Sequence, residues 1–275
     1  MEKTLKGIGA VSIAFIMALT IIPLVGSSQA FAKAGKCSLV KKVIVQKYDK
    51  AKKKWITSET TSYKYNKHKD PVKITDKYHD SREGSDSIVI KYDYRNGKRN
   101  THTIKRDGDT DTVTFNKKGN PIKRVYKSPV YGDQVTTYSY YKQGTIKQET
   151  SESKEENGKT EIYKTKYSTV FKKKLPVKVT LTEFSDGIWG TPRQTQHFNK
   201  KGFIQEVKLA EVKSLVKYKM KKGRIAMVAQ DNKGFNGDWK ERKKIIYTKG
   251  KISKARYRNM INEIVWGGEI QFCWY

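Results

Sequence analysis

The chain has 275 residues and carries 58 lysines and arginines against 27 aspartates and glutamates, a formal net charge of +31. Lysine supplies most of the excess, and its mobile, hydrated ammonium group favours non-specific attraction to polyanions and argues against base-by-base reading of nucleic acid. The alternative is that the charge only keeps an exported β-protein soluble. After residue 32 no apolar run approaches the roughly 20 residues that a membrane-spanning helix needs.

The first 32 residues have the three parts of a secretory signal. Lys3 and Lys6 give a positive start, residues 8–25 are almost entirely apolar, and Ala30-Phe31-Ala32 supplies small residues at a cleavage site. We therefore expect cleavage after Ala32; an uncleaved membrane anchor is the alternative. Residues 33–275 are expected to form a single exported domain, secreted or held non-covalently at the cell surface.

Short strands follow one another along the exported part. Residues 38–48, 55–65 and 87–94 alternate apolar and polar side chains with a period of two, which is the pattern of a half-buried β-strand. Asn96-Gly97 is a strong hairpin signal, because both residues tolerate positive φ. Further short strands are expected at 101–105, 110–116, 122–126, 134–141, 177–182 and 216–220.

One phrase recurs along the chain: an aromatic residue, a few polar residues, a glycine, one residue and an isoleucine. It is clearest in Phe198-Asn-Lys-Lys-Gly202-Phe-Ile204 and in Tyr140-Tyr-Lys-Gln-Gly144-Thr-Ile146. Each copy is typical of a strand end, a tight turn and the next strand. The expected turn glycines are Gly97, Gly119, Gly144, Gly202, Gly223 and Gly250.

Three segments leave the organisation open. Residues 209–216 fit a strand or one face of a short helix, and residues 260–266 are ambiguous in the same way. A weak seam near 151–158 is the only candidate boundary between two domains. The sequence therefore predicts an all-β fold, an antiparallel meander of successive hairpins forming one large twisted or curved sheet, with closure into a barrel left open.

Two segments of the predicted sheet resemble the YD repeats of secreted and surface bacterial proteins of the RHS type. They are Tyr92-Asp-Tyr94-Arg-Asn-Gly97 and Thr137-Tyr-Ser-Tyr140-Tyr-Lys-Gln-Gly144-Thr-Ile146. The resemblance implies stacked β-hairpins and a surface or carbohydrate-contact role, and it implies no catalytic residues. Most copies lack the aspartate of that family.

The two cysteines, Cys37 and Cys273, lie near the two ends of the exported part. An exported protein with an even number of cysteines most often pairs them, so a disulfide is expected; two free thiols are the alternative. The bridge would fix the first strand beside the end of the chain.

Few residues suggest chemistry. Asp107-Gly-Asp109-Thr-Asp111 begins like a calcium loop but lacks the later ligands, so neither a metal nor a cofactor is expected. The four histidines lack the spacing of a zinc site or a triad and are expected at the surface: His68, His79, His102 and His197. Glu161, Glu183 and Asp186 remain candidate carboxylates for a glycan hydrolase, with no motif behind them.

Aromatic loops offer possible contacts with sugar rings. Trp189, Phe235 and Trp239 are the candidate residues, and the alternative is that the tryptophans only cap the core. The leading hypothesis is an exported, non-enzymatic β-repeat protein that associates with an anionic or sugar-rich polymer of the cell envelope. A secreted hydrolase acting on glycan or wall is the alternative, and the oligomeric state is left open.

Overall fold

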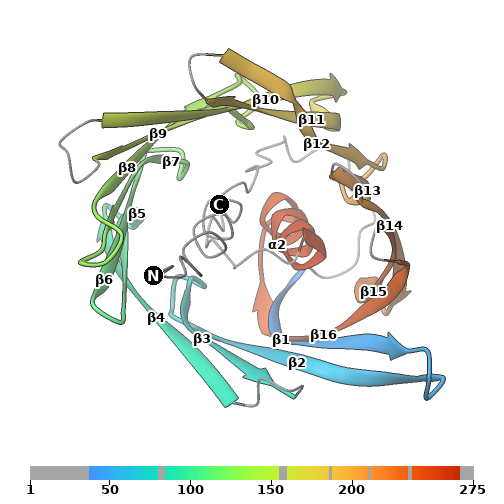
Figure 1. Cartoon of the computed structure of the whole chain (residues 1–275). Helices are drawn as coiled ribbons and strands as arrows, with labels where there is room; N and C mark the ends of the chain where they lie inside the picture. Colours follow the sequence, from blue (N-terminus) through green and yellow to red (C-terminus); the bar gives the residue numbers. More distant parts are fainter. Residues whose placement is uncertain are drawn as a thin grey trace, which may run out of the picture.

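The computed structural model describes residues 37–79, 84–154, 160–185, 188–209, 212–234 and 237–266. Within them, sixteen antiparallel strands form one closed barrel (Figure 1), which confirms the all-β fold class and settles the closure of the sheet. The predicted signal, residues 1–32, lies outside the described residues. The strands are β1 (Ser38–Asp49), β2 (Lys54–Tyr65), β3 (Pro71–Tyr78), β4 (Gly84–Arg95), β5 (Lys98–Arg106), β6 (Asp109–Phe115), β7 (Pro121–Lys127), β8 (Gln134–Tyr140), β9 (Ile146–Lys154), β10 (Thr160–Lys172), β11 (Leu175–Ser185), β12 (Ile188–Phe198), β13 (Ile204–Leu209), β14 (Val212–Lys221), β15 (Arg224–Lys233) and β16 (Trp239–Lys251).

Each strand pairs with the next along the chain, and β16 pairs with β1 to close the ring. At the closure, Val43 of β1 lies opposite Ile245 of β16. Closure leaves no free sheet edge that could pair with another chain. β9 and β10 pair from Thr160 and Lys154 onward, so the barrel wall continues on both sides of the suggested seam.

Alternation along the strands sets the two faces of the wall. In β14, Ser214 and Val216 are buried, whereas Lys213, Leu215 and Lys217 are exposed. Leu209 thus ends β13 and residues 212–216 belong to β14, so the alternative of a short helix there was wrong. Residues that lie opposite each other on paired strands point to the same side of the sheet. The inward-facing residues of one strand therefore identify the inward-facing residues of its neighbours around the ring.

The recurring phrase builds a five-residue turn. The Asn116 backbone N–H donates to the Asn120 carbonyl over 2.8 Å, and the Gly119 N–H donates to the Asn116 carbonyl over 2.8 Å. The Asn116 Oδ1 also accepts from the N–H groups of Lys118 and Asn120. Gly119 has a φ of 85°, a conformation that favours glycine.

The same turn recurs at Asn199–Phe203 and, with backbone bonds only, at Tyr141–Thr145. A further copy, Asn66–Asp70, escaped the sequence analysis because Lys69, with a φ of 67°, stands in place of the glycine. Gly97 and Gly223 instead occupy two-residue turns. Gly250, expected at a turn, lies inside β16 at a φ of 136° against Leu39.

The aromatic residue of the phrase has its own role in the barrel. Hydroxyl groups of tyrosines on one strand donate to backbone carbonyls at the start of the preceding strand: Tyr140 to Pro121 over 2.5 Å, and Tyr247 to Ile225 over 2.6 Å. Tyr218 donates in the same way to the carbonyl of Ile204. The recurring tyrosines therefore connect successive hairpins at one end of the barrel.

Of the residues that the structure describes, one helix lies inside the barrel: α2 (Lys254–Trp266), beside β1 and β13–β16 (Figure 1). It resolves the ambiguity over residues 260–266. Ser253 caps its start, accepting the Arg256 N–H through its Oγ over 3.1 Å. Near its end, the buried Lys243 donates to the carbonyls of Ile264 and Val265 over 2.7 and 3.3 Å. Among the residues described, no helix has both the length and the apolar character needed to cross a membrane.

Candidate functional site

The outward side of the wall is lysine-rich around most of the ring. We define the outer lysine face as a set of exposed or half-buried lysines that each lie opposite an outward-pointing residue of an adjacent strand. Its members are Lys42, Lys73, Lys91, Lys105, Lys123, Lys164, Lys166, Lys178, Lys208, Lys213, Lys217, Lys219 and Lys244. They come from ten strands, so the basic character surrounds the barrel. Lys243 is an exception, since it points inward to α2.

Many carboxylates lie on the opposite, inward side. Asp111 pairs with Arg124 at 2.8 Å, Asp109 accepts a hydrogen bond from Tyr126, and Glu161 accepts one from Tyr163 over 2.5 Å. Glu149 is 5% exposed, and burial raises its pKa to about 8, although the Tyr167 hydrogen bond and Arg124 lower it. Glu206 and Asp231 are exceptions on the outward side, where they pair with Lys208, Lys213 and Lys217. The lysines still outnumber the carboxylates there, so the outer surface is strongly basic.

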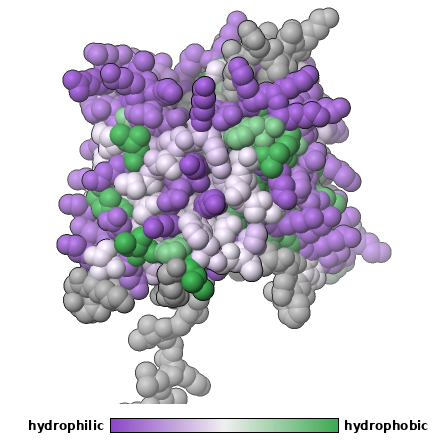
Figure 2. Space-filling view, turned by 90° about the horizontal axis from the view of Figure 1, so that it is seen from above, coloured by the Kyte–Doolittle hydropathy of each residue, from purple (hydrophilic) through white to green (hydrophobic). Residues whose placement is uncertain are grey.

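Figure 2 shows the wall from the side uppermost in Figure 1. Hydrophilic residues predominate along its edges, and the hydrophobic residues form small patches separated by paler or hydrophilic ones. Exposed apolar side chains such as Ile162 (46%) and Val170 (56%) alternate along β10 with exposed polar ones. The lysines and the apolar residues thus share the outer surface.

Trp189 belongs to a basic and aromatic cluster on this surface, the Trp189 cluster, which also contains Phe184, Lys164 and Lys166. The rings of Trp189 and Phe184 have centroids 5.4 Å apart, and the Lys164 Nζ lies 5.0 Å from the Phe184 ring. The Lys166 Nζ lies 6.0 Å from the Trp189 ring, and Trp189 is 43% exposed. Three strands contribute to the cluster, which is why sequence reasoning found only Trp189.

Trp239, in contrast, lies opposite the inward-facing Asn232, and its ring lies near Gly234. The structure therefore places Trp239 and Trp189 on opposite sides of the wall and does not bring the two candidate sugar contacts together. Phe235 lies outside the described residues. A second outer cluster, which sequence reasoning missed, has the Arg242 guanidinium 4.3 Å from the Trp55 ring, with Tyr48 beside it.

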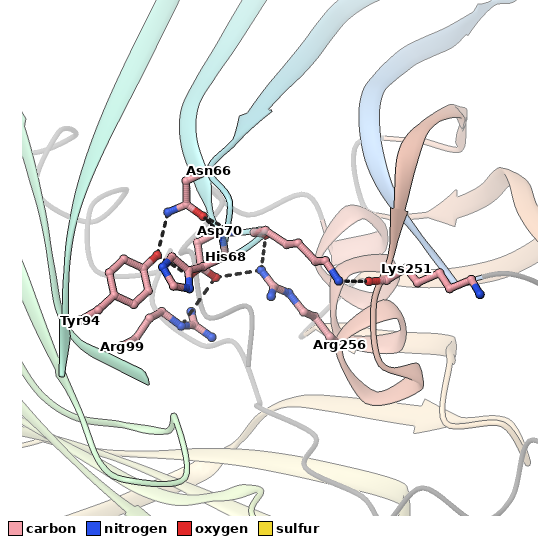
Figure 3. Close-up of polar contacts among 8 residues, drawn as sticks. Asn66, His68, Asp70, Tyr94, Arg99, Lys251 and Arg256 are labelled. Carbon is pink, nitrogen blue, oxygen red and sulfur yellow. Dashed lines mark hydrogen bonds and ion pairs between the residues drawn. The ribbon is translucent and has the colours of Figure 1, made fainter. Parts of the chain in front are cut away.

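At the end of the barrel where α2 begins, buried polar residues connect the helix to the wall (Figure 3). Asp70 is 3% exposed and accepts from the Tyr94 hydroxyl over 2.6 Å and from the Arg256 guanidinium over 2.9 Å. The Arg99 Nε lies 3.7 Å from the same carboxylate. Because Asp70 occupies the fifth position of the turn Asn66–Asp70, the recurring turn places this charge inside the barrel.

The neighbouring groups complete this Asp70 cluster. Asn66 donates to the Tyr94 hydroxyl over 2.7 Å, and the His68 ring stacks on Tyr94 with centroids 4.1 Å apart. Burial and the Asp70 hydrogen bond raise the pKa of Tyr94 to about 12, so the phenol keeps its proton. Arg256 also donates to the Lys69 carbonyl over 2.5 Å. The cluster is a structural connection between α2, β4, β5 and one turn.

The other candidate residues do not converge. Asp107 is in a two-residue turn, whereas Asp109 and Asp111 have separate partners; among the described residues no group of three or more His, Cys, Asp or Glu side chains could hold a metal ion. Glu183 pairs with Arg193. Asp186 and Cys273 lie outside the described residues, so the disulfide stays a prediction.

One histidine contradicts the expected surface placement. His102 is 3% exposed between Tyr92 and Phe115, with ring centroids 5.7 and 5.3 Å away. Burial, with Arg99 and Arg124 nearby, lowers its pKa to about 3. His102 occupies an inward position of β5, and only the strand register reveals this.

No family model and no curated protein sequence matches the chain. Twenty-seven chains of solved structures match its fold. One is the crystal structure of a porin-like protein from Bacteroides uniformis ATCC 8492, with 13% identity and a TM-score of 0.54, covering 76% of this chain and 98% of that one. A porin-like protein from Bacteroides vulgatus ATCC 8482 has 10% identity over 77% and 99% of the two chains, and its TM-score of 0.34 is too low to support an inference. This likeness concerns the fold alone: the closed barrel of this chain is porin-like in fold. The YD-repeat resemblance stays a prediction.

Proposed function

We propose that this chain is an exported, non-enzymatic barrel that binds an anionic, sugar-containing polymer of the cell envelope through its outer lysine face. The observation that supports this is the segregation of charge across one wall. Lysines project outward from ten strands, whereas carboxylates such as Asp109, Asp111 and Glu149 point inward. A flexible polyanion can follow a basic surface of this kind without a rigid pocket.

The same surface argues against burial in a bilayer, the setting that the porin-like neighbour would suggest. A barrel that spans a membrane presents an outward apolar band about 25 Å tall, and a lysine at the bilayer midplane costs about 2–4 kcal/mol. On β14, Lys213, Lys217 and Lys219 alternate along the outward side of a single strand. An outer surface with lysines on ten strands is better matched to water and to anionic groups.

The Trp189 cluster would add contact with the sugar part of such a polymer. A half-exposed indole beside a second ring offers an apolar face, and Lys164 and Lys166 place positive charge at its border. Aromatic faces of this kind pack against sugar rings, while ammonium groups attract phosphate or carboxylate substituents.

The test is cosedimentation of the mature chain with purified cell wall that retains its anionic polymer and with wall from which that polymer has been extracted. We expect binding only to the first, falling steeply between about 50 and 500 mM salt because exposed charges are screened. A variant with Lys213, Lys217 and Lys219 changed to Gln should bind less. The control changes Lys117, Lys118 and Lys142 to Gln, removing equal charge from turns at the barrel end. Equal binding to both walls, or binding that salt does not affect, would refute the proposal.

A further inference from the structure

Helix α2 has a polar face whose buried groups have no hydrogen-bond partner among the described residues. Tyr257, Met260 and Ile261 pack in the core, on the side of β14–β16. Asn259 and Glu263 lie one turn apart on the opposite side of the helix, three and seven residues after Arg256. Since Arg256 bonds to Asp70, this second face points toward β2–β5.

The two side chains on this face are buried and unsatisfied. Asn259 is 2% exposed and Glu263 is 6% exposed. Within the described part of the chain, neither the amide atoms of Asn259 nor the carboxyl oxygens of Glu263 have a hydrogen-bond partner. Leaving such a group unpaired costs about 1–3 kcal/mol, so a pair of them calls for a physical explanation.

Further unpartnered groups lie on the facing wall. The Tyr92 hydroxyl on β4 and the His102 Nδ1 on β5 are buried and have no hydrogen-bond partner in the described residues. Their rings are in edge contact at 5.7 Å. Glu263 lies within electrostatic reach of Arg99 on β5 and of Tyr63 on β2, which places its carboxyl opposite these strands.

The charged groups in this region already have partners in one another. Arg256 and Arg99 share the carboxylate of Asp70, and burial raises the pKa of Glu263 well above its ordinary value, which favours the uncharged carboxyl. What remains is a set of amide, carboxyl, hydroxyl and imidazole groups that both donate and accept hydrogen bonds. Hydroxyl groups of a guest molecule both donate and accept hydrogen bonds, so they would satisfy such a mixed set.

We propose that the Asn259 and Glu263 face of α2, with Tyr92 and His102 opposite, binds a small molecule rich in hydroxyl groups, of mono- or disaccharide size, inside the barrel. One helical turn, about 5.4 Å, separates the two α2 side chains, which matches the width of a sugar ring. Barrels of sixteen strands are wide enough that their walls do not fill the interior. The inference is independent of polymer binding on the outer face.

The experiment is isothermal titration of the mature chain with glucose, N-acetylglucosamine, trehalose and maltose in about 500 mM salt, which suppresses attraction to the outer lysines. We expect at least one sugar to bind, with an affinity that salt does not change. A variant with Asn259→Leu and Glu263→Leu should bind at least tenfold more weakly.

That variant should fold as stably as the natural chain, because it removes buried groups that have no partner. The control is Gln205→Leu, an exposed residue of β13, which should bind as the natural chain does. If none of the four sugars binds, or if the double variant binds as tightly as the natural chain, the proposed internal site does not exist.

Discussion

Replacing Asp70 by alanine should destabilise the barrel more than any surface charge removal, because it would leave two buried guanidinium groups without their shared counterion. The side chains of Arg99 and Arg256 are 10% and 13% exposed, and that of Asp70 is 4% exposed. Breaking a buried ion pair by removing one partner costs about 3–5 kcal/mol. Asp70→Asn keeps an acceptor for the Tyr94 hydroxyl and should cost less than alanine does.

The assay is equilibrium unfolding in guanidinium chloride followed by tryptophan fluorescence. The matched control is Asp231→Ala, which removes an exposed pair with Lys217 at 3.8 Å and should change the free energy of unfolding by less than about 1 kcal/mol. In a double-mutant cycle, Asp70→Ala and Arg256→Met should couple by about 0.5–3 kcal/mol. An Asp70→Ala chain as stable as the Asp231→Ala control would show that Asp70 does not stabilise the connection between α2 and the wall.

In the same unfolding assay, Gly202→Ala should lower the free energy of unfolding by about 1–3 kcal/mol more than Gly97→Ala does. Both glycines have positive φ, but a Cβ at Gly202 would lie 2.7 Å from the Arg258 Cδ, whereas a Cβ at Gly97 would meet open space. The pKa of Glu149 is raised to about 8 from an ordinary value of 4.5, so its proton stabilises the fold fully below that ordinary value and the contribution is lost as pH rises toward 8. Thermal scans at several pH values should therefore show that Tm falls less steeply with rising pH for Glu149→Gln than for the natural chain. The same pH dependence in both chains would contradict the raised pKa. Trp189→Ala should weaken wall binding about threefold to tenfold in cosedimentation without altering its salt dependence, and a changed salt dependence would assign the residue an electrostatic role.

Most of the fold could be predicted from local sequence patterns. Alternation in segments such as 87–94 and the turn chemistry of Asn96-Gly97 predict strands and hairpins directly, because both depend on neighbouring residues only. Residues 260–266 of helix α2 stayed ambiguous in the sequence because the two covered faces of the helix give no clear amphipathic contrast. The turn at Asn66–Asp70 was missed because Lys69 adopts the backbone conformation that glycine holds in the other copies.

The candidate sites depend on register, which no single segment encodes. The Trp189 cluster needs Phe184 opposite both Lys164 and Trp189 across two strand pairs. The Asp70 cluster joins residues separated by 186 positions. Even the direction of a side chain changes with one residue of register shift, which explains why Trp189 and Trp239 could be grouped in sequence yet lie on opposite sides of the wall.

We propose that the outward side of this barrel faces water and anionic polymer. Flotation of the mature chain with neutral and with anionic lipid vesicles, each followed by a wash in about 500 mM salt, distinguishes this placement from insertion into a bilayer. The outer lysine face predicts no flotation with neutral vesicles and attachment to anionic vesicles that the salt wash releases. Salt-resistant incorporation into neutral vesicles would refute this placement and would assign the wall to the interior of a bilayer.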